Sequence, residues 1–187
     1  MIKMRNTLLP DDGGAKGKHL DGSIIECGVY KGSSFIRLAT FRELLENTSS
    51  RKIIGFDAFG DFPKQDNNHD NDFIKIFEMA GGPGININEL ESVLNYKSIR
   101  NYKLIKGDII ETVPKFINEN PKIKIAMLHI DVDVFKPTKV ILNNFFENVV
   151  KGGVIIFDNY KTTVGETNAI DDFFFNKKVT FNKFNFS

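Results

Sequence analysis

Five acidic side chains stand at, or within two residues of, the ends of the predicted strands: Glu26, Asp57, Asp108, Asp131 and Asp158. In an open parallel sheet the carboxyl ends of the strands meet at one edge, and ligands bind outside that edge near the point where the strand order reverses. Carboxylates gathered there repel one another unless a positive group lies among them. We therefore expect this edge to be the binding site and expect its ligands to carry positive charge.

The elements that position these acids alternate along the chain. Strands are expected at 23–27, 52–56, 102–105, 123–130, 154–157 and 179–186. Helices are expected from Ser33 or Ser34 onward, around 73–77, after Asn88, and over 112–117, 138–150 and 167–175. Strand and helix in alternation predict an α/β fold in which a doubly wound, mostly parallel sheet has helices on both faces.

The first strand leads into a turn of the pattern Glu26-x-Gly28-x-x-x-Gly32-x-Ser34, which differs from the G-x-G-x-x-G dinucleotide fingerprint. Glycines in such a turn let the backbone approach a ligand closely. Asp57 is placed to accept the hydroxyls of a ribose, and Asp108 could accept from an adenine amino group. Because no P-loop lysine or other basic residue awaits a phosphate, a phosphate-free nucleoside fits better than NAD or ATP.

In their order and rough spacing, the motifs resemble those of the macrocin O-methyltransferase family, class I S-adenosylmethionine (SAM)-dependent enzymes that methylate sugar hydroxyls. They are GSIIECGVYKGS at 22–33, FDAF at 56–59, KGD at 106–108 with TVP at 112–114, LHIDVDVF at 128–135 and GGVIIFDNY at 152–160. The resemblance covers about residues 22–175 and implies a Rossmann-like sheet of six to seven strands.

The resemblance also implies a cofactor site and a metal site. SAM would be held by Glu26, Gly28, Tyr30, Gly32, Ser33, Asp57, Ala58, Phe59, Asp108 and Ile109. Mg²⁺ would be held by Asp131, Asp158 and Asn159. Bound metal acidifies a coordinated hydroxyl and orients it. Asp131 and Asp133 are the expected catalytic residues, with Asp133 the best candidate for the general base and Lys161 or His69 as second choices.

Asn159 is a departure, because the family usually has a second aspartate there. The amide still offers a carbonyl oxygen, and Asp…Asp-Asn is the ligand set of the related catechol O-methyltransferase. Three functions are therefore carried forward: a Mg²⁺-dependent O-methyltransferase acting on a sugar or related polyol, a catechol-type O-methyltransferase, and a SAM- or nucleoside-binding module without catalysis. An NAD-dependent oxidoreductase is disfavoured by the glycine spacing.

Length and composition set the frame for these functions. The 187 residues suit one domain at 22–187, preceded by an arm or partial lid at 1–21. Lys and Arg number 25 against 24 Asp and Glu, and this balance argues against a nucleic-acid binder. The single Cys27 and the lack of a membrane-length apolar segment favour a cytoplasmic protein with no membrane partner. Phenylalanines at 173–175 and at 181, 184 and 186 are expected in the core or in a homodimer contact.

Overall fold

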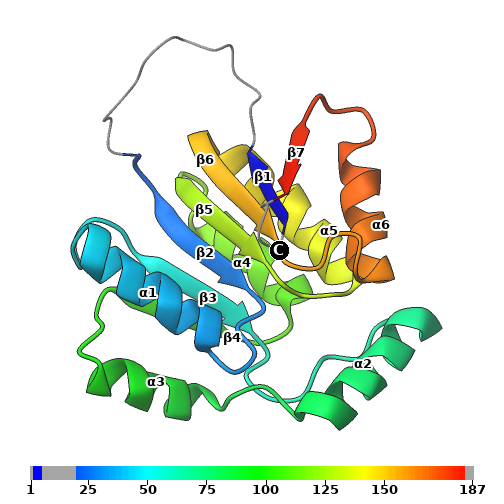
Figure 1. Cartoon of the computed structure of the whole chain (residues 1–187), viewed down its shortest axis with the longest axis horizontal. Helices are drawn as coiled ribbons and strands as arrows, with labels where there is room; N and C mark the ends of the chain where they lie inside the picture. The colour runs from blue at the N-terminus through cyan, green and yellow to red at the C-terminus, as the bar shows by residue number, and fades with distance from the viewer. Residues whose placement is uncertain (1, 6–19, 184–187) are drawn as a thin grey trace.

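The computed structural model describes residues 2–5 and 20–183 and shows one sheet with helices packed against it (Figure 1). The strands are β1 (Ile2–Arg5), β2 (Ser23–Cys27), β3 (Ile53–Asp57), β4 (Tyr102–Lys106), β5 (Ile125–Ile130), β6 (Val149–Phe157) and β7 (Thr180–Lys183). The helices are α1 (Ser33–Leu45), α2 (Asn68–Gly81), α3 (Ile87–Tyr96), α4 (Ile109–Glu119), α5 (Phe135–Phe145), the 3₁₀ helix η1 (Phe146–Asn148) and α6 (Val164–Phe174).

The strands lie in the order β4-β3-β2-β5-β6-β1-β7. The five strands from β4 to β6 are paired in parallel and form the body of the sheet. β1 and β7 are four-residue strands at one edge; β1 is antiparallel to both β6 and β7, so β7 runs in the direction of β6. The predicted mostly parallel α/β sheet is thus confirmed. The strand order reverses between β2 and β5, which places the expected crevice at their carboxyl ends.

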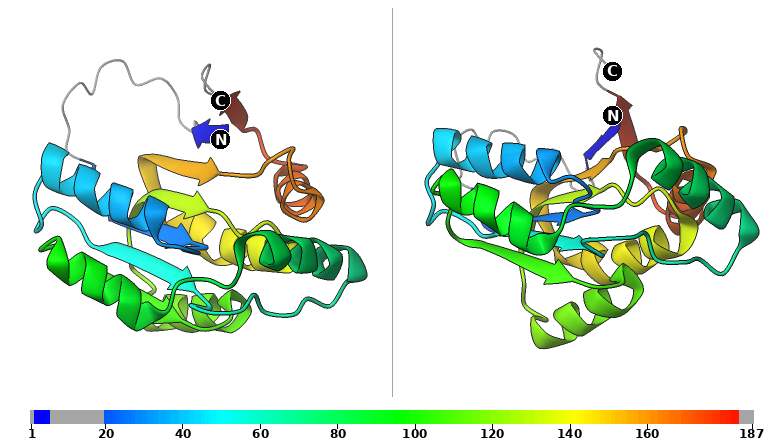
Figure 2. Two further views of the ribbon diagram at one scale, coloured as in Figure 1. Left: turned by 60° about the horizontal axis from the view of Figure 1, so that its bottom comes forward. Right: turned by 90° about the horizontal axis from the view of Figure 1, so that it is seen from below.

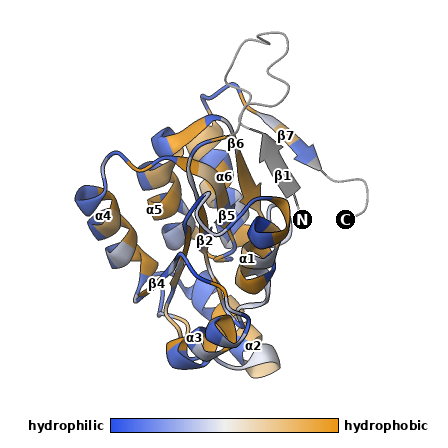
Figure 3. Cartoon of the chain, turned by 90° about the vertical axis from the view of Figure 1, so that its left-hand side faces the viewer, coloured by the Kyte–Doolittle hydropathy of each residue, from blue (hydrophilic) through white to orange (hydrophobic). Residues whose placement is uncertain are grey.

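Helices lie on both faces of the sheet (Figure 2), and an apolar cluster holds each set of helices to it. On one face, α4, α5 and α6 pack through side chains such as Val113, Ile141 and Ile170. On the other face, α1 and α3 pack through side chains such as Phe35 and Leu90. Hydrophobic residues concentrate accordingly in the strands and along the helices next to them (Figure 3). Within the described residues, no helix is long and apolar enough to cross a membrane.

Several predicted boundaries are wrong for local reasons. β6 begins at Val149 rather than at 154, because the pair Gly152-Gly153 lies within the strand, with Gly152 at φ 83°. α4 begins at Ile109 because Asp108 caps it, so Pro114 lies inside the helix and not in its first turn. α1 begins at Ser33 as predicted, but the residue before it is Gly32 at φ 80° and no serine side chain caps the helix.

The chain ends also differ from the expectation. β1, at residues 2–5 of the expected arm, forms a strand that no local signal predicted. The rest of the expected lid at 6–19, together with Phe184 and Phe186, lies outside the described residues. Phe174 is buried in the core whereas Phe175 is 84% exposed. The homodimer and the boundary at residue 22 stay predictions.

Candidate active site

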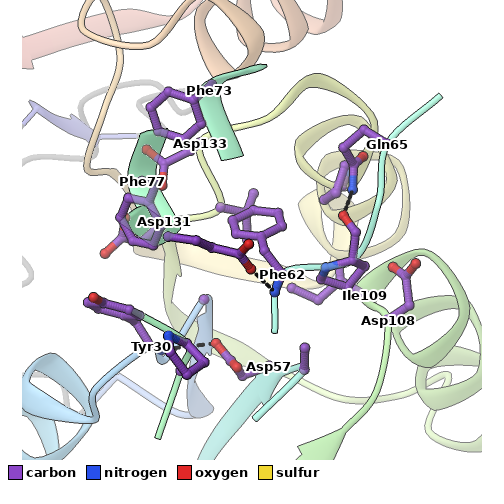
Figure 4. A pocket seen from close by; sticks show the side chains of 18 of the residues that line it. Tyr30, Asp57, Phe62, Gln65, Phe73, Phe77, Asp108, Ile109, Asp131 and Asp133 are labelled. Atoms are coloured by element: carbon purple, nitrogen blue, oxygen red, sulfur yellow. Dashed lines mark hydrogen bonds between the residues drawn. The ribbon is translucent and has the colours of Figure 1, made fainter. Parts of the chain in front are cut away.

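A cavity of about 450 Å³ opens at the carboxyl edge of the sheet, where β2, β3, β4, β5 and β6 end (Figure 4). The structure brings ten of the predicted site residues to its wall: Gly28, Tyr30, Asp57, Ala58, Asp108, Ile109, Asp131, Asp133, Asp158 and Asn159. No lysine, arginine or histidine is among the described residues that line it. The edge chosen from the acids of the sequence is therefore a real cavity with a negative wall.

Asp57 organises the floor of this cavity through three backbone hydrogen bonds. Its Oδ2 accepts from the amides of Val29 (2.8 Å) and Tyr30 (2.9 Å), and its Oδ1 accepts from the amide of Phe59 (2.6 Å). The carboxylate thereby ties the turn after β2 to the loop after β3. Each carboxylate oxygen has two lone pairs, and Oδ1 accepts only one of these bonds, so Oδ1 can still accept from a ribose hydroxyl.

Asp108 lies between the end of β4 and the start of α4. Its Oδ1 accepts from the amide of Ile110 (2.9 Å) and caps the helix. Its Oδ2 accepts no hydrogen bond from the described residues and is free for a donor in the cavity. Ile109 follows it and lines the cavity as an apolar neighbour.

Four predicted cofactor residues do not line the cavity. Gly32 and Ser33 form the start of α1, and Phe59 is packed in the core between the sheet and α3. Glu26 is fully buried, with Oε1 2.9 Å from Nδ1 of His129. His129 is the hydrogen-bonded core residue that the sequence predicts: burial lowers its pKa, but the bond to Glu26 and the nearby carboxylates outweigh this and raise it. The role of these four in binding SAM stays a prediction.

The acids at the ends of β5 and β6 form an acidic corner of Asp131, Asp133, Asp158 and Asn159. The amide Nδ2 of Asn159 donates to Oδ1 of Asp133 (2.6 Å) and to Oδ1 of Asp131 (3.3 Å). Burial and the charge of Asp158 raise the pKa of Asp131 to about 7 and that of Asp133 to about 6. Asp133 also has a left-handed backbone, with φ 62°, a conformation that is uncommon outside glycine and is often found at functional sites.

Glu166 supports this corner from behind and was missed by sequence reasoning. It lies in the first turn of α6, is fully buried, and accepts from the backbone amides of Asp133 (3.2 Å) and Asn159 (3.3 Å). Burial, and then the charges of Asp133 and Asp131, raise its pKa to about 8. No strand ends directly before Glu166 in the sequence, so the pattern of acids at strand ends could not predict it.

An aromatic wall, formed by Phe62, Phe73 and Phe77, closes the cavity opposite the sheet and was also missed. Phe77 contacts Phe62, Phe73 and the ring of Tyr30, with centroids 5.0–6.4 Å apart. The Tyr30 hydroxyl donates to the carbonyl of Gly81 at the end of α2 (2.7 Å). The two second-choice bases, His69 and Lys161, do not line the cavity.

The raised carboxyl pKa values predict that the ligand-free protein loses stability as the pH rises. In the unfolded chain these carboxyls ionise near pH 4, whereas in the fold Asp131, Asp133 and Glu166 hold their protons to about pH 6–8. The stability is full below the unfolded pKa and is lost as pH rises through the folded values, by roughly 5–7 kcal/mol from pH 5 to 8. Urea unfolding in EDTA at pH 5, 6.5 and 8 measures this loss in the free energy of unfolding.

Glu166→Gln should remove about 1–3 kcal/mol of that loss, because a buried amide cannot ionise. Glu111→Gln, an exposed position on α4, is the matched control and should follow the wild type. A Glu166→Gln protein that loses stability as steeply as the wild type would contradict the assignment.

A model of the family described as macrocin-O-methyltransferase (TylF) matches residues 15–184. The chain belongs to this family. It is accordingly a SAM-dependent O-methyltransferase, and SAM is its methyl donor. The resemblance seen in the motifs is confirmed over nearly the whole chain. No curated protein matches the methyltransferase.

Solved methyltransferases share its fold. The O-methyltransferase NovP has a TM-score of 0.71 at 18% identity, with 88% of this chain and 72% of that chain covered. The calicheamicin methyltransferase CalS11 has a TM-score of 0.61 at 23% identity, covering 88% and 73%. At these identities the likeness concerns the fold alone.

The predicted magnesium ligands lie at the ends of β5 and β6. Among residues 2–5 and 20–183, no group of three or more His, Cys, Asp and Glu side chains is arranged to hold a metal ion. The predicted set of Asp131, Asp158 and Asn159 contains two carboxylates and one amide, so it is smaller than such a group. Its role as a magnesium site is therefore a proposal.

Proposed function

We propose that this methyltransferase transfers the methyl group of SAM to a hydroxyl of a sugar or related polyol, with Mg²⁺ at Asp131, Asp158 and Asn159. The observation that carries the proposal is that one cavity joins the predicted nucleoside side, with Asp57 and Asp108, to the acidic corner. Its wall has six carboxylates and no basic side chain among the described residues. A sulfonium nucleoside and a divalent cation both match this charge.

The side chains of the acidic corner fit a magnesium ion chemically. Oxygen donors come from the ends of two adjacent strands, which is the donor type that Mg²⁺ prefers. Burial and mutual repulsion raise the pKa of Asp131, as expected for carboxylates that lack a cation. The Asn159 amide now donates to two carboxylates, and rotation of its terminal group would present its oxygen instead.

Asp133 is the proposed base. When bound, Mg²⁺ would lower the pKa of an acceptor hydroxyl and hold it in place. Asp133 would take the hydroxyl proton, while the acceptor oxygen bonds to the methyl carbon and the C–S electron pair stays on sulfur. Its pKa of about 6 lies close to the pH at which a base is most effective. Glu166 holds the backbone of Asp133 and Asn159 and so positions the corner.

A catechol-type acceptor is the second candidate. The set of Asp131, Asp158 and Asn159 favours it, and so does the aromatic wall, because flat rings stack on aromatic side chains. The two candidates differ in the ring that bears the accepting hydroxyl.

A methyl-transfer assay with Mg²⁺ across sugar glycosides and catechols tests the proposal. We expect turnover with a sugar or polyol acceptor and a loss of about 100-fold or more in excess EDTA, because the acceptor hydroxyl then keeps its proton. Calorimetry with SAM alone provides the control, since binding without any turnover would indicate a module that lacks catalysis. Turnover with catechols only would select the second candidate, and equal turnover in EDTA would contradict the metal role.

A further inference from the structure

The side chain of Gln65 has a buried oxygen atom without a partner. Gln65 precedes α2, lines the cavity and is only 4% exposed. Its Nε2 donates to the carbonyl of Pro63 (2.8 Å). Its Oε1 accepts no hydrogen bond within the part of the chain that the structure describes. Buried polar atoms are nearly always hydrogen-bonded, so this oxygen calls for a donor from a ligand or from water.

The orientation of the Gln65 amide is fixed by its neighbours. A flipped amide would set Oε1 against the carbonyl oxygen of Pro63, and two acceptors repel. The backbone of Gln65 is also fixed, because its amide donates to Oδ1 of Asn71 (2.8 Å) and its carbonyl accepts from Nδ2 of Asn71 (2.7 Å). Neither the side chain nor the loop can turn to satisfy Oε1 without losing these bonds.

Gln65 lies on the nucleoside side of the cavity. Figure 4 shows it on the side of Asp108 and Ile109, away from Asp133. The next residue, Asp66, bonds to Lys136 at the start of α5 (2.5 Å). That bond, the charge of Asp66 and the charge of Asp108 raise the pKa of Lys136, so Lys136, the partner of Asp66, lies within electrostatic reach of Asp108. The acidic corner is at the other strand ends.

We propose that Gln65 binds the cofactor by accepting, at Oε1, a hydrogen bond from the 6-amino group of the SAM adenine. An aromatic amino group has two N–H donors. The free Oδ2 of Asp108 would take one and Oε1 of Gln65 the other. A neutral amide suits this uncharged group, and both acceptors lack another donor within the described residues. The inference rests on the proposed placement of adenine at Asp108.

The test compares two nucleosides that differ at this group and, as a consequence, at the neighbouring N1, which carries a hydrogen in the inosyl compound. S-inosylhomocysteine has a carbonyl where S-adenosylhomocysteine has the amino group. We expect Gln65→Met to weaken S-adenosylhomocysteine binding by about 5–10-fold, as for one lost hydrogen bond. The preference of the protein for the adenosyl over the inosyl compound should fall by the same factor. Calorimetry on the full chain without acceptor measures both dissociation constants.

Two further variants complete the experiment. Lys64→Met introduces the same residue at the exposed neighbouring position, and this variant should bind both compounds as the wild type does. Gln65→Glu keeps an acceptor oxygen and should keep most of the preference. The preference is a ratio measured on one protein, so it is insensitive to any misfolded fraction of a variant.

Three outcomes would overturn the proposal. An unchanged preference in Gln65→Met would show that Oε1 does not contact the amino group. Unchanged cofactor binding with a raised acceptor KM would place Oε1 at the acceptor instead. A wild type that binds S-adenosylhomocysteine without preferring it over the inosyl compound would remove adenine from Asp108. Only this third outcome also contradicts the placement of the nucleoside in the proposed function, and it leaves the metal and acceptor proposals untouched.

Discussion

Asp158→Ala is expected to lower Mg²⁺-dependent methyl transfer by about 100-fold or more, while the dissociation constant of SAM changes by less than about threefold. Asp158 ends β6 in the acidic corner and is one of the two carboxylates proposed to hold the metal. Asp57, Asp108 and Ile109, which form the proposed nucleoside side of the cavity, lie at the ends of β3 and β4. Initial rates at saturating SAM and calorimetry with SAM test the two halves of this expectation.

The same substitution should raise the stability of the ligand-free protein. The charge of Asp158 contributes to the raised pKa of both Asp131 and Asp133, so its removal relieves repulsion at pH 8. A gain in stability together with a loss in activity is typical of residues kept for function. If Asp158 served only the fold, its removal would instead lower stability.

Asp172→Ala provides the matched control. Asp172 is an exposed residue of α6 that forms an ion pair with Lys139. Exposed ion pairs contribute little to stability. We expect wild-type rates from this variant. Full turnover of Asp158→Ala, with or without EDTA, would refute the proposed metal site.

Much of the site was predictable because, in a parallel sheet, the position of a residue after a strand in the sequence fixes where it lies in the fold. A residue that follows a buried strand must lie at the carboxyl edge, and all five strands of the parallel body end there. Asp57, Asp108, Asp131 and Asp158 line the cavity for this reason. Glu26 does not, since it lies within β2, one residue before the strand ends, and pairs with His129 in the core.

Residues that reach the cavity from other elements could not be predicted this way. Gln65 lines it from a loop and Phe77 from α2, whereas Glu166, in the first turn of α6, supports the acidic corner from behind. Their positions depend on how helices and loops fold back over the sheet, and no local pattern records that. Strand β1 is a similar case, because pairing between Ile2–Arg5 and β6 joins residues about 150 positions apart.

Gly28→Ala is the second change with a large expected effect, and it acts on the fold. Gly28 has φ 90°, which L side chains rarely adopt, and a methyl group there would lie 1.8 Å from the carbonyl oxygen of Asp131. The conflict is with backbone, which cannot move aside as a flexible side chain does. We expect the free energy of unfolding to fall by about 3–5 kcal/mol, measured by urea unfolding.

Gly60→Ala is the control, because Gly60 also lines the cavity but a methyl group there meets nothing within 4 Å. It should unfold within about 0.5 kcal/mol of the wild type. A Gly28→Ala protein as stable as Gly60→Ala would mean that the ends of β2 and β5 are farther apart than the structure has them.

The close approach at Gly28 has a functional consequence. β2 and β5 are the neighbours at which the strand order reverses, and the amide of Asp131 donates to the carbonyl of Cys27 (2.9 Å). A residue without a side chain lets the turn after β2 lie directly against the end of β5. The proposed nucleoside side and the acidic corner thereby share one cavity, which the proposed methyl transfer from SAM to a metal-bound hydroxyl would require. Any Gly28→Ala protein that does fold should therefore lose methyl transfer.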